Sequence, residues 1–337
     1  MKYFKLVIAL AFLTFQICAQ NNVNEFVKDG VALHDNSEFE KAIDTYKKAL
    51  KLEPNSSLVN YEIALSYFSK EDFKKSIKYS DKVIDINDEF LLQAYLTKGS
   101  SLDMMNKTDE SIEVFEKAIE STEGHFLLDY NLALNYYKKN LYEKAQKNAI
   151  NAIQKNTNHA SSHLMLTNIN QQIGNRVEAI LSGLYFLFLE PTTDRSLQVL
   201  NIVHENMKKG VSKDEEKENT INILLDQNES DRLSAADLML SLMEASNSTE
   251  GNSDKSETEK FIESTKIFVS VLGELNTNEH DDIWETFYIP FFYKLSKSNN
   301  FVTYCKYITQ AEDPSSKLWL ESNPDKLDEF DNWLKDN

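Results

Sequence analysis

The chain has 337 residues, of which 41% are hydrophobic, with only 8 glycines and 5 prolines. This composition suits a folded helical protein and argues against an all-β sandwich, which needs many turns. The net charge is −18, from 54 acidic and 36 basic residues. We therefore expect no binding of nucleic acid through nonspecific phosphate contacts. Residues 194–337 carry most of the excess negative charge, with 29 acidic and 15 basic side chains.

The first 19 residues have the pattern of a secretory signal peptide. Lys2 and Lys5 precede a ten-residue apolar stretch over 6–15, and Ala19 is a small residue suited to cleavage. Ten residues form about 15 Å of helix, roughly half a bilayer, so this stretch is too short for an anchor. We expect an exported, periplasmic or secreted mature chain. A lipoprotein at Cys18 is the less favoured alternative, because an isoleucine and not a small residue precedes it.

After that stretch, no segment is long and apolar enough to span a membrane. Cleavage would leave Cys305 as the single cysteine, which excludes an intramolecular disulfide. The stability of the chain must then come from helix packing.

A helix-pair pattern recurs five times at a spacing of 34 residues. Pro54 closes the first copy and Pro191 closes the fifth, 137 residues later, which is four periods and one inserted residue. Small residues recur where the two helices of a pair would cross, at Gly30, Ala64, Gly99, Ala133 and Thr167. A fixed period of this size indicates a stack of helix pairs, in which each repeat packs against its neighbours.

In the first copy, large and small side chains follow one another in a fixed order before a proline: Phe26, Gly30, Leu33, Ala42, Tyr46, Ala49 and Pro54. This order resembles the tetratricopeptide repeat family, and in particular exported bacterial members of a Bacteroidetes-like kind. The resemblance covers residues 23–193, in copies over 23–56, 57–90, 92–125, 126–159 and 160–193. It implies an all-α superhelical stack of about five helix pairs that binds other proteins and is not an enzyme.

Beyond the array, the pattern remains helical. Residues 194–245 are expected to be a helical extension or a degenerate capping repeat, residues 246–260 a polar loop or linker, and residues 261–337 a C-terminal helical region. Apolar stripes at helical spacing predict helices over Ser196–Lys209, Glu216–Leu225, Phe261–Leu275, Asp281–Ser298 with a kink at Pro290, and Phe301–Gln310. The aromatic side chains at Trp284, Phe287, Tyr288, Phe291, Phe292 and Tyr293 are expected to be buried.

The sequence contains no pattern typical of an enzyme, so we expect no catalytic residue and no cofactor. His159 and His163 have a spacing suited to metal ligands, but no third ligand is evident, so we expect no metal. Residues 226–237 place oxygen side chains as a calcium loop does, with Asp231 where such a loop needs glycine. A calcium-dependent binding module is therefore a minor alternative.

By analogy with the family, positions 2, 5, 9 and 12 of each first helix line a concave groove. We expect ten apolar side chains at these positions to bind the partner: Leu58, Tyr61, Leu65, Phe68, Leu96, Leu127, Tyr130, Leu134, Tyr137 and Leu164. The cations with which some family members bind a C-terminal carboxylate are absent from these positions. The groove is instead suited to the hydrophobic anchors of a protein or peptide partner.

The sequence leaves a second interpretation open. The C-terminal helices could fold back and fill the groove permanently, which would make the chain a structural protein. Neither the identity of the partner nor the oligomeric state follows from the sequence.

Overall fold

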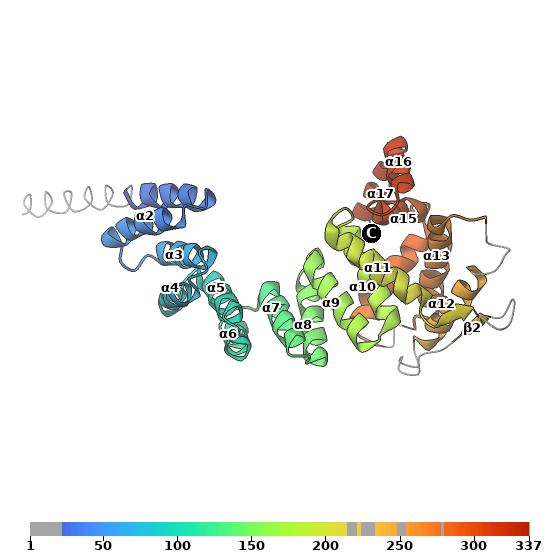
Figure 1. Cartoon of the computed structure of the whole chain (residues 1–337), viewed down its shortest axis with the longest axis horizontal. Helices are drawn as coiled ribbons and strands as arrows, with labels where there is room; N and C mark the ends of the chain where they lie inside the picture. Colours follow the sequence, from blue (N-terminus) through green and yellow to red (C-terminus); the bar gives the residue numbers. More distant parts are fainter. Residues whose placement is uncertain (1–21, 214–220, 224–232, 248–253, 278–279, 337) are drawn as a thin grey trace, which may run out of the picture. The chain divides into compact units, whose positions relative to one another are not determined.

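The computed structural model describes residues 22–213, 221–223, 233–247, 254–277 and 280–336. The predicted signal peptide therefore lies outside the described residues. The chain forms two compact units, Met1–Lys139 and Asn140–Asn337. Among the described residues the regular secondary structure is helical, apart from one antiparallel pair of short strands, in agreement with the all-α prediction (Figure 1).

The N-terminal unit is a series of antiparallel helices. A helix over residues 22–35 is followed by α2 (Phe39–Leu52), α3 (Ser57–Ser69), α4 (Phe73–Ile86), α5 (Leu91–Met104), α6 (Thr108–Ser121) and α7 (Phe126–Lys138). From α2 to α7 each helix contacts the next, and α5 also contacts α3 and α7. The first helices of successive pairs therefore lie side by side, which is the packing that the 34-residue period predicts.

The two helices of a pair approach closely where one of them carries a small residue. A Cβ atom added to Gly30 would lie 2.3 Å from the Tyr46 ring, and one added to Gly99 would lie 2.3 Å from the Phe115 ring. Both rings are buried. At these two of the five predicted small residues, a ring of the second helix thus lies against the backbone of the first.

The C-terminal unit begins with three helices of the repeat pattern, α8 (Tyr142–Lys155), α9 (Ala160–Ile173) and α10 (Arg176–Leu189), and continues with α11 (Asp194–Lys208). Two strands, β1 (Val211–Lys213) and β2 (Ile221–Ile223), pair antiparallel with Ser212 opposite Asn222. The remaining elements are α12 (Ser234–Asn247), α13 (Glu257–Leu275), the π-helix η2 (Trp284–Tyr288), α14 (Ile289–Lys297), α15 (Phe301–Thr309), α16 (Pro314–Ser322) and α17 (Pro324–Asp336).

The helix predicted over Glu216–Leu225 is wrong where the structure describes it. Residues Ile221–Ile223 form a strand, since two β-branched isoleucines flank a polar residue with the period of two that suits a strand. The short hairpin with β1 supplies their backbone hydrogen bonds.

The helix predicted over Asp281–Ser298 is divided into η2 and α14. The Asp282 carboxylate caps its start by accepting hydrogen bonds from the backbone N–H groups of Trp284 at 2.9 Å and Glu285 at 3.0 Å. Pro290 lies in the first turn of α14. Because η2 runs directly into α14, Pro290 is not at a free helix start, and its missing N–H interrupts the backbone hydrogen bonding just after the π-helix.

Helix α10 carries the core of this unit. It contacts α9, α11, α12, α15 and η2, and most of its side chains are buried. The Tyr304 hydroxyl of α15 donates a hydrogen bond to the Leu184 carbonyl at 3.0 Å. The predicted aromatic cluster is buried in part: Trp284, Tyr288 and Phe292 are buried, and the other three rings are half-buried.

A buried arginine joins α10 to the two helices that follow. The Arg176 guanidinium donates to the Asp237 carboxylate at 2.6 Å, to the Ser241 hydroxyl at 2.9 Å and to the Met207 carbonyl at 3.1 Å. Asp237 is the last residue of the calcium-loop alternative, whose residues 226–232 lie outside the described residues. Its carboxylate is engaged with Arg176, which removes one ligand from that alternative.

His163 of α9 lies in the buried contact with η2. Its Nε2 donates to the Thr157 carbonyl at 2.9 Å, so its Nδ1 accepts from the Tyr288 hydroxyl at 2.6 Å. Burial is the main reason why the pKa of His163 is lowered to about 4; the hydrogen bond to Thr157 acts in the opposite direction, and neighbouring His159 acts in the same direction as burial. The imidazole is therefore neutral in the folded protein near neutral pH.

We predict that Gly99→Ala destabilises the protein. The added methyl group meets the Phe115 ring, and overpacking of this kind costs about 1–3 kcal/mol, more than the gain of about 1 kcal/mol in helix propensity. Urea unfolding measures the loss. In a Phe115→Leu background the same substitution should cost less, whereas Ser100→Ala on the same helix should change the stability little. Equal costs in both backgrounds would contradict the assigned contact.

We predict that the free energy of unfolding falls as the pH is lowered from about 6.5 to about 4. The pKa of His163 is lower in the folded state than the usual 6.5, so the unfolded state takes up the proton first. The contribution is fully present above about pH 6.5 and amounts to about 3 kcal/mol. Urea unfolding at several pH values measures how the free energy of unfolding depends on pH. In the His163→Gln variant, the fall between about pH 6.5 and 4 should disappear. Parallel slopes in the two proteins would refute the prediction.

Candidate functional site

The predicted groove residues of α3 form one stripe along that helix. Leu58, Tyr61, Leu65 and Phe68 follow one another at a spacing of three or four residues, so they share one face. All four are half-buried. The opposite side of α3 is buried in the unit and is also largely apolar, with Val59, Ile63, Ala64 and Tyr67. The helix is thus apolar on two faces, and its own unit fully covers only one of them.

Helix α7 repeats this arrangement. Its predicted groove residues Leu127, Tyr130, Leu134 and Tyr137 are half-buried, whereas Leu128, Leu132, Ala133 and Tyr136 are buried. Because α5 contacts both α3 and α7, it lies between the two apolar stripes.

The face of α5 at the same positions is mainly polar. Leu96 is its half-buried apolar member, and the other three residues are Gln93, Ser100 and Asp103. Asp103 forms an ion pair with Lys138 at the end of α7. The three helices therefore present two apolar stripes separated by a polar one.

Two aromatic side chains of the α3 stripe are held by neighbouring rings. The Tyr61 ring stacks on Phe90 with 5.8 Å between centroids, and Phe68 packs edge-on against Phe73 at 5.6 Å. Burial raises the pKa of Tyr61, and the nearby Glu62 carboxylate raises it further. These rings are therefore neutral and fixed in position before any partner arrives.

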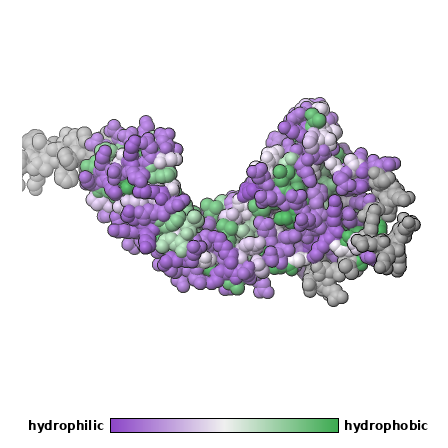
Figure 2. Space-filling model, viewed as in Figure 1, coloured by the Kyte–Doolittle hydropathy of each residue, from purple (hydrophilic) through white to green (hydrophobic). Residues whose placement is uncertain are grey.

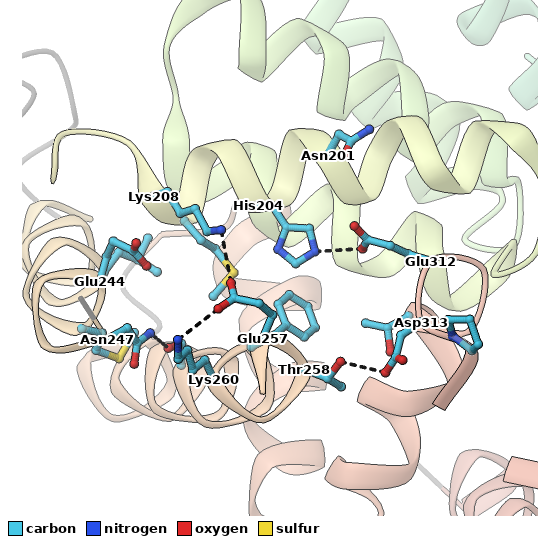
Figure 3. Close-up of a pocket in the computed structure, with 17 residues that line it drawn as sticks. Asn201, His204, Lys208, Glu244, Asn247, Glu257, Thr258, Lys260, Glu312 and Asp313 are labelled. Atoms are coloured by element: carbon cyan, nitrogen blue, oxygen red, sulfur yellow. Dashed lines mark hydrogen bonds and ion pairs between the residues drawn. The ribbon is translucent and has the colours of Figure 1, made fainter. Parts of the chain in front are cut away.

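The stripes are a surface and not an enclosed pocket. Hydrophobic residues are visible among hydrophilic ones on the face of the N-terminal unit shown in Figure 2. A cavity of about 380 Å³ in this unit is lined by residues 70–74 and Met105 and includes none of the predicted residues. A larger cavity belongs to the C-terminal unit and likewise includes none of them (Figure 3).

Leu164, the tenth predicted residue, belongs to α9 in the C-terminal unit and is half-buried. Its companions on that face are polar, and α11 bonds to two of them. The Asn206 amide donates to the Gln171 side chain, and the Arg195 guanidinium donates to the Ser161 hydroxyl at 3.0 Å. An extended apolar stripe is therefore absent from this face of α9.

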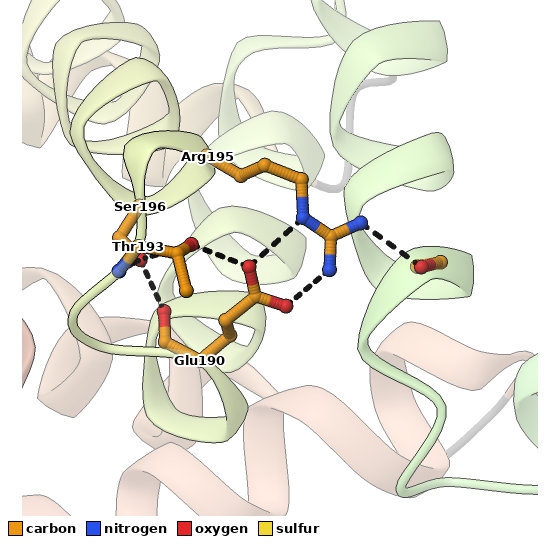
Figure 4. Close-up of polar contacts among 5 residues, drawn as sticks. Glu190, Thr193, Arg195 and Ser196 are labelled. Atoms are coloured by element: carbon orange, nitrogen blue, oxygen red, sulfur yellow. Dashed lines mark hydrogen bonds and ion pairs between the residues drawn. The ribbon is translucent and has the colours of Figure 1, made fainter. Parts of the chain in front are cut away.

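Arg195 is a feature that the sequence analysis did not identify. Its Nε donates to Glu190 at 2.8 Å, and a second guanidinium nitrogen pairs with the other carboxylate oxygen (Figure 4). The Ser196 hydroxyl donates to the Glu190 carbonyl at 2.6 Å, which completes the turn between α10 and α11. Arg195 stands 34 residues after Ser161, so the repeat spacing could have located it.

The candidate metal ligands do not converge. His159 is hydrogen-bonded to Ser162 at 2.7 Å, and His163 makes the contacts described above. Within the described ranges no group of histidine, cysteine, aspartate or glutamate side chains could hold a metal ion. Burial raises the pKa of the Cys305 thiol well above its ordinary value, so the reactive thiolate is disfavoured. Helices that could cross a bilayer are also lacking in the part that the structure describes.

Known protein families and proteins are similar to this chain over the segment that contains the repeats. A TPR repeat model matches residues 30–71, and a tetratricopeptide repeat model matches residues 59–90 and 92–125. TPR repeat-containing protein MJ1428 of Methanocaldococcus jannaschii is 29% identical over 133 residues, 38% of this chain and 23% of that protein. Photosystem I assembly protein Ycf3 of Rippkaea orientalis is 27% identical over 104 residues, 28% of this chain and 60% of that protein.

The chain thus spans less than two thirds of the length of either relative. Among solved structures, TTC0263, a TPR protein of Thermus thermophilus, is similar with a TM-score of 0.45 and 14% identity, over 54% of this chain and 99% of that one. The matched models and the side-by-side helix pairs agree over the same segment. Residues 30–90 and 92–125 of this chain therefore match tetratricopeptide repeat models.

Proposed function

We propose that this chain is a non-catalytic scaffold that binds a segment of a partner protein on the apolar stripes of α3 and α7. Tetratricopeptide repeats generally serve as scaffolds for protein interaction. The observation that carries the proposal is that α3 and α7 are apolar on two faces, of which only one is fully buried in the unit. An amphipathic helix that only had to pack on its own domain would be polar on the second face.

Burial of the half-exposed side chains would supply the binding energy. Each Å² of apolar surface removed from water contributes about 25 cal/mol, and a few aromatic anchors usually dominate such an interface. Tyr61 and Tyr130 are the candidates for these anchors, because a tyrosine combines a large apolar area with a polar tip. Ring stacking already fixes Tyr61, which lowers the entropic cost of binding.

The polar face of α5 indicates what the partner segment looks like. Neighbouring helix axes lie about 8–10 Å apart, so α3 and α7 are about 20 Å apart across α5. An extended segment covers that distance in about six residues. We propose that the partner offers two apolar anchors at about this spacing, with polar residues between them.

We also propose that the chain acts outside the cytoplasm, in the periplasm or the wider cell envelope. The support is the pattern of residues 1–19, with two lysines before a short apolar stretch and a small residue at the expected cleavage site.

We predict that a photo-crosslinking side chain at position 61 or 130 captures the same partner segment. Both positions lie on the proposed contact surface, whereas Lys117 on α6 is exposed on the second helix of its pair and serves as the control. Crosslinking is carried out in the native envelope, and mass spectrometry maps the captured peptide. Capture from position 117 alone, or of unrelated peptides from positions 61 and 130, would contradict the proposal.

The double variant Tyr61→Ala with Tyr130→Ala should lose that partner and keep its thermal stability. Loss of one anchor weakens binding by about 2 kcal/mol or more, roughly thirtyfold. A large fall in melting temperature with unchanged capture would show that these rings belong to a permanently covered core. That result would favour the structural alternative, in which the chain's own C-terminal helices fill the groove.

We predict that the mature protein recovered from the envelope begins at Gln20. Intact-mass measurement detects removal of the first 19 residues directly. Retention of these residues would argue against export by this route, and a lipid-modified chain beginning at Cys18 would establish the lipoprotein alternative.

A further inference from the structure

The C-terminal unit contains a cavity of about 850 Å³ that the proposed scaffold function does not use (Figure 3). It lies between α11, α12, the first half of α13 and the turn that joins α15 to α16. A volume of this size is typical of small-molecule sites.

The floor of the cavity is apolar. Met207, Leu240, Met243 and Phe261 line it, and each is at least nine-tenths buried. The His204 ring lies edge-on against Phe261 with 5.1 Å between centroids. A ligand in this cavity would therefore rest its apolar part on two thioethers, a leucine and an aromatic ring.

The rim is charged and carries more carboxylates than cations. Four lining residues are acidic and two are lysines. Both lysines bind Glu257, with 3.5 Å from Lys208 and 3.0 Å from Lys260. The hydrogen bond from Lys260 is the main reason why the pKa of Glu257 is lowered. The positive charge of the rim is thus directed at one carboxylate.

Two of the other carboxylates also have partners. Glu312 lies 3.2 Å from His204 Nε2. Asp313 accepts hydrogen bonds from the hydroxyls of Thr258 at 2.7 Å and Ser316 at 2.7 Å. Burial alone would raise the pKa of Asp313, but these bonds hold it well below its ordinary value.

Glu244 of α12 differs from the other three. Within the part of the chain that the structure describes, its carboxylate is half-buried and makes no hydrogen bond or ion pair. Burial is the main reason why its pKa is raised. Lys208 lowers it and the nearby Glu257 raises it, while Lys260 and the buried Arg176 also lower it. A carboxylate at the edge of an apolar floor is stabilised by any cation that can reach it.

We propose that this cavity binds a small amphipathic cation, a primary ammonium group on an apolar chain. The ammonium group pairs with Glu244, and the chain lies over Met207, Leu240, Met243 and Phe261. An anionic ligand would meet the carboxylate excess of the rim. A neutral apolar ligand would seal Glu244 away from water without a partner, which is costly.

The test is calorimetric titration of the mature full-length chain with four probes: hexylammonium, 1-hexanol, hexanoate, and Nα-acetyl-lysine N-methylamide, whose ε-ammonium group is free. Hexylammonium should bind about tenfold or more tightly than hexanol, since a charge-assisted hydrogen bond is gained, and hexanoate should not bind. If Nα-acetyl-lysine N-methylamide binds more tightly than hexylammonium, the natural source of the ammonium group is a lysine side chain. Tighter binding of hexylammonium would point to a free amine.

Two variants test whether Glu244 is the residue that binds the ammonium group. Glu244→Gln should abolish the preference for hexylammonium over hexanol, whereas Glu263→Gln, an exposed position of α13 outside the cavity, should keep it. In NMR spectra, the methyl signals of Met207 and Met243 should shift on titration with hexylammonium, whereas that of Met165 in α9 should not. This measurement locates the bound ligand without any substitution. Equal binding of hexanol and hexylammonium, no binding of either, or an unchanged preference in Glu244→Gln would overturn the proposal.

Discussion

The close approach of two helices at a small residue is the contact on which the repeats depend. Where Gly30 and Gly99 face Tyr46 and Phe115, each ring lies on the backbone of the other helix and leaves no room for a methyl group. This contact fixes the distance between the two helices of a pair. Small residues recur at this position every 34 or 35 residues, and the first helices α3, α5 and α7 of successive pairs lie side by side. The apolar stripes of α3 and α7 follow from that placement.

Much of the repeat geometry could be predicted from the sequence because it is local. The small residue, the second-helix residue that faces it and the turn between the helices all lie within one period. That turn contains a residue in the left-handed region of backbone space in every copy: Ser37, Glu71, Asn106, Asn140 and Gly174. A left-handed conformation favours glycine, yet only the fifth copy has one. The spacing of the copies therefore indicated these turns better than residue type did.

Contacts between distant segments of the C-terminal unit could not be predicted in this way. Arg176 and Asp237 are 61 residues apart, and nothing in the local sequence of either indicates a buried ion pair. His163 and Tyr288 are 125 residues apart, so the local sequence, in which we expected no metal at His163, gave no indication of the buried hydrogen bond between them. The Ile221–Ile223 strand was missed because three residues are too few for helical and extended periods to be distinguished.

Three helices of this chain show why an apolar sequence does not by itself locate a binding surface. Helices α3, α7 and α10 are all apolar on more than one face. In α10 the second face is covered by η2 and α15. Tyr288 of η2 hydrogen-bonds to His163 of the neighbouring α9, and Tyr304 of α15 donates to the Leu184 carbonyl of α10. The corresponding stripes of α3 and α7 are half-buried within their own unit. The same pattern thus serves the core in one unit and, we propose, a partner in the other, and only the three-dimensional contacts distinguish them.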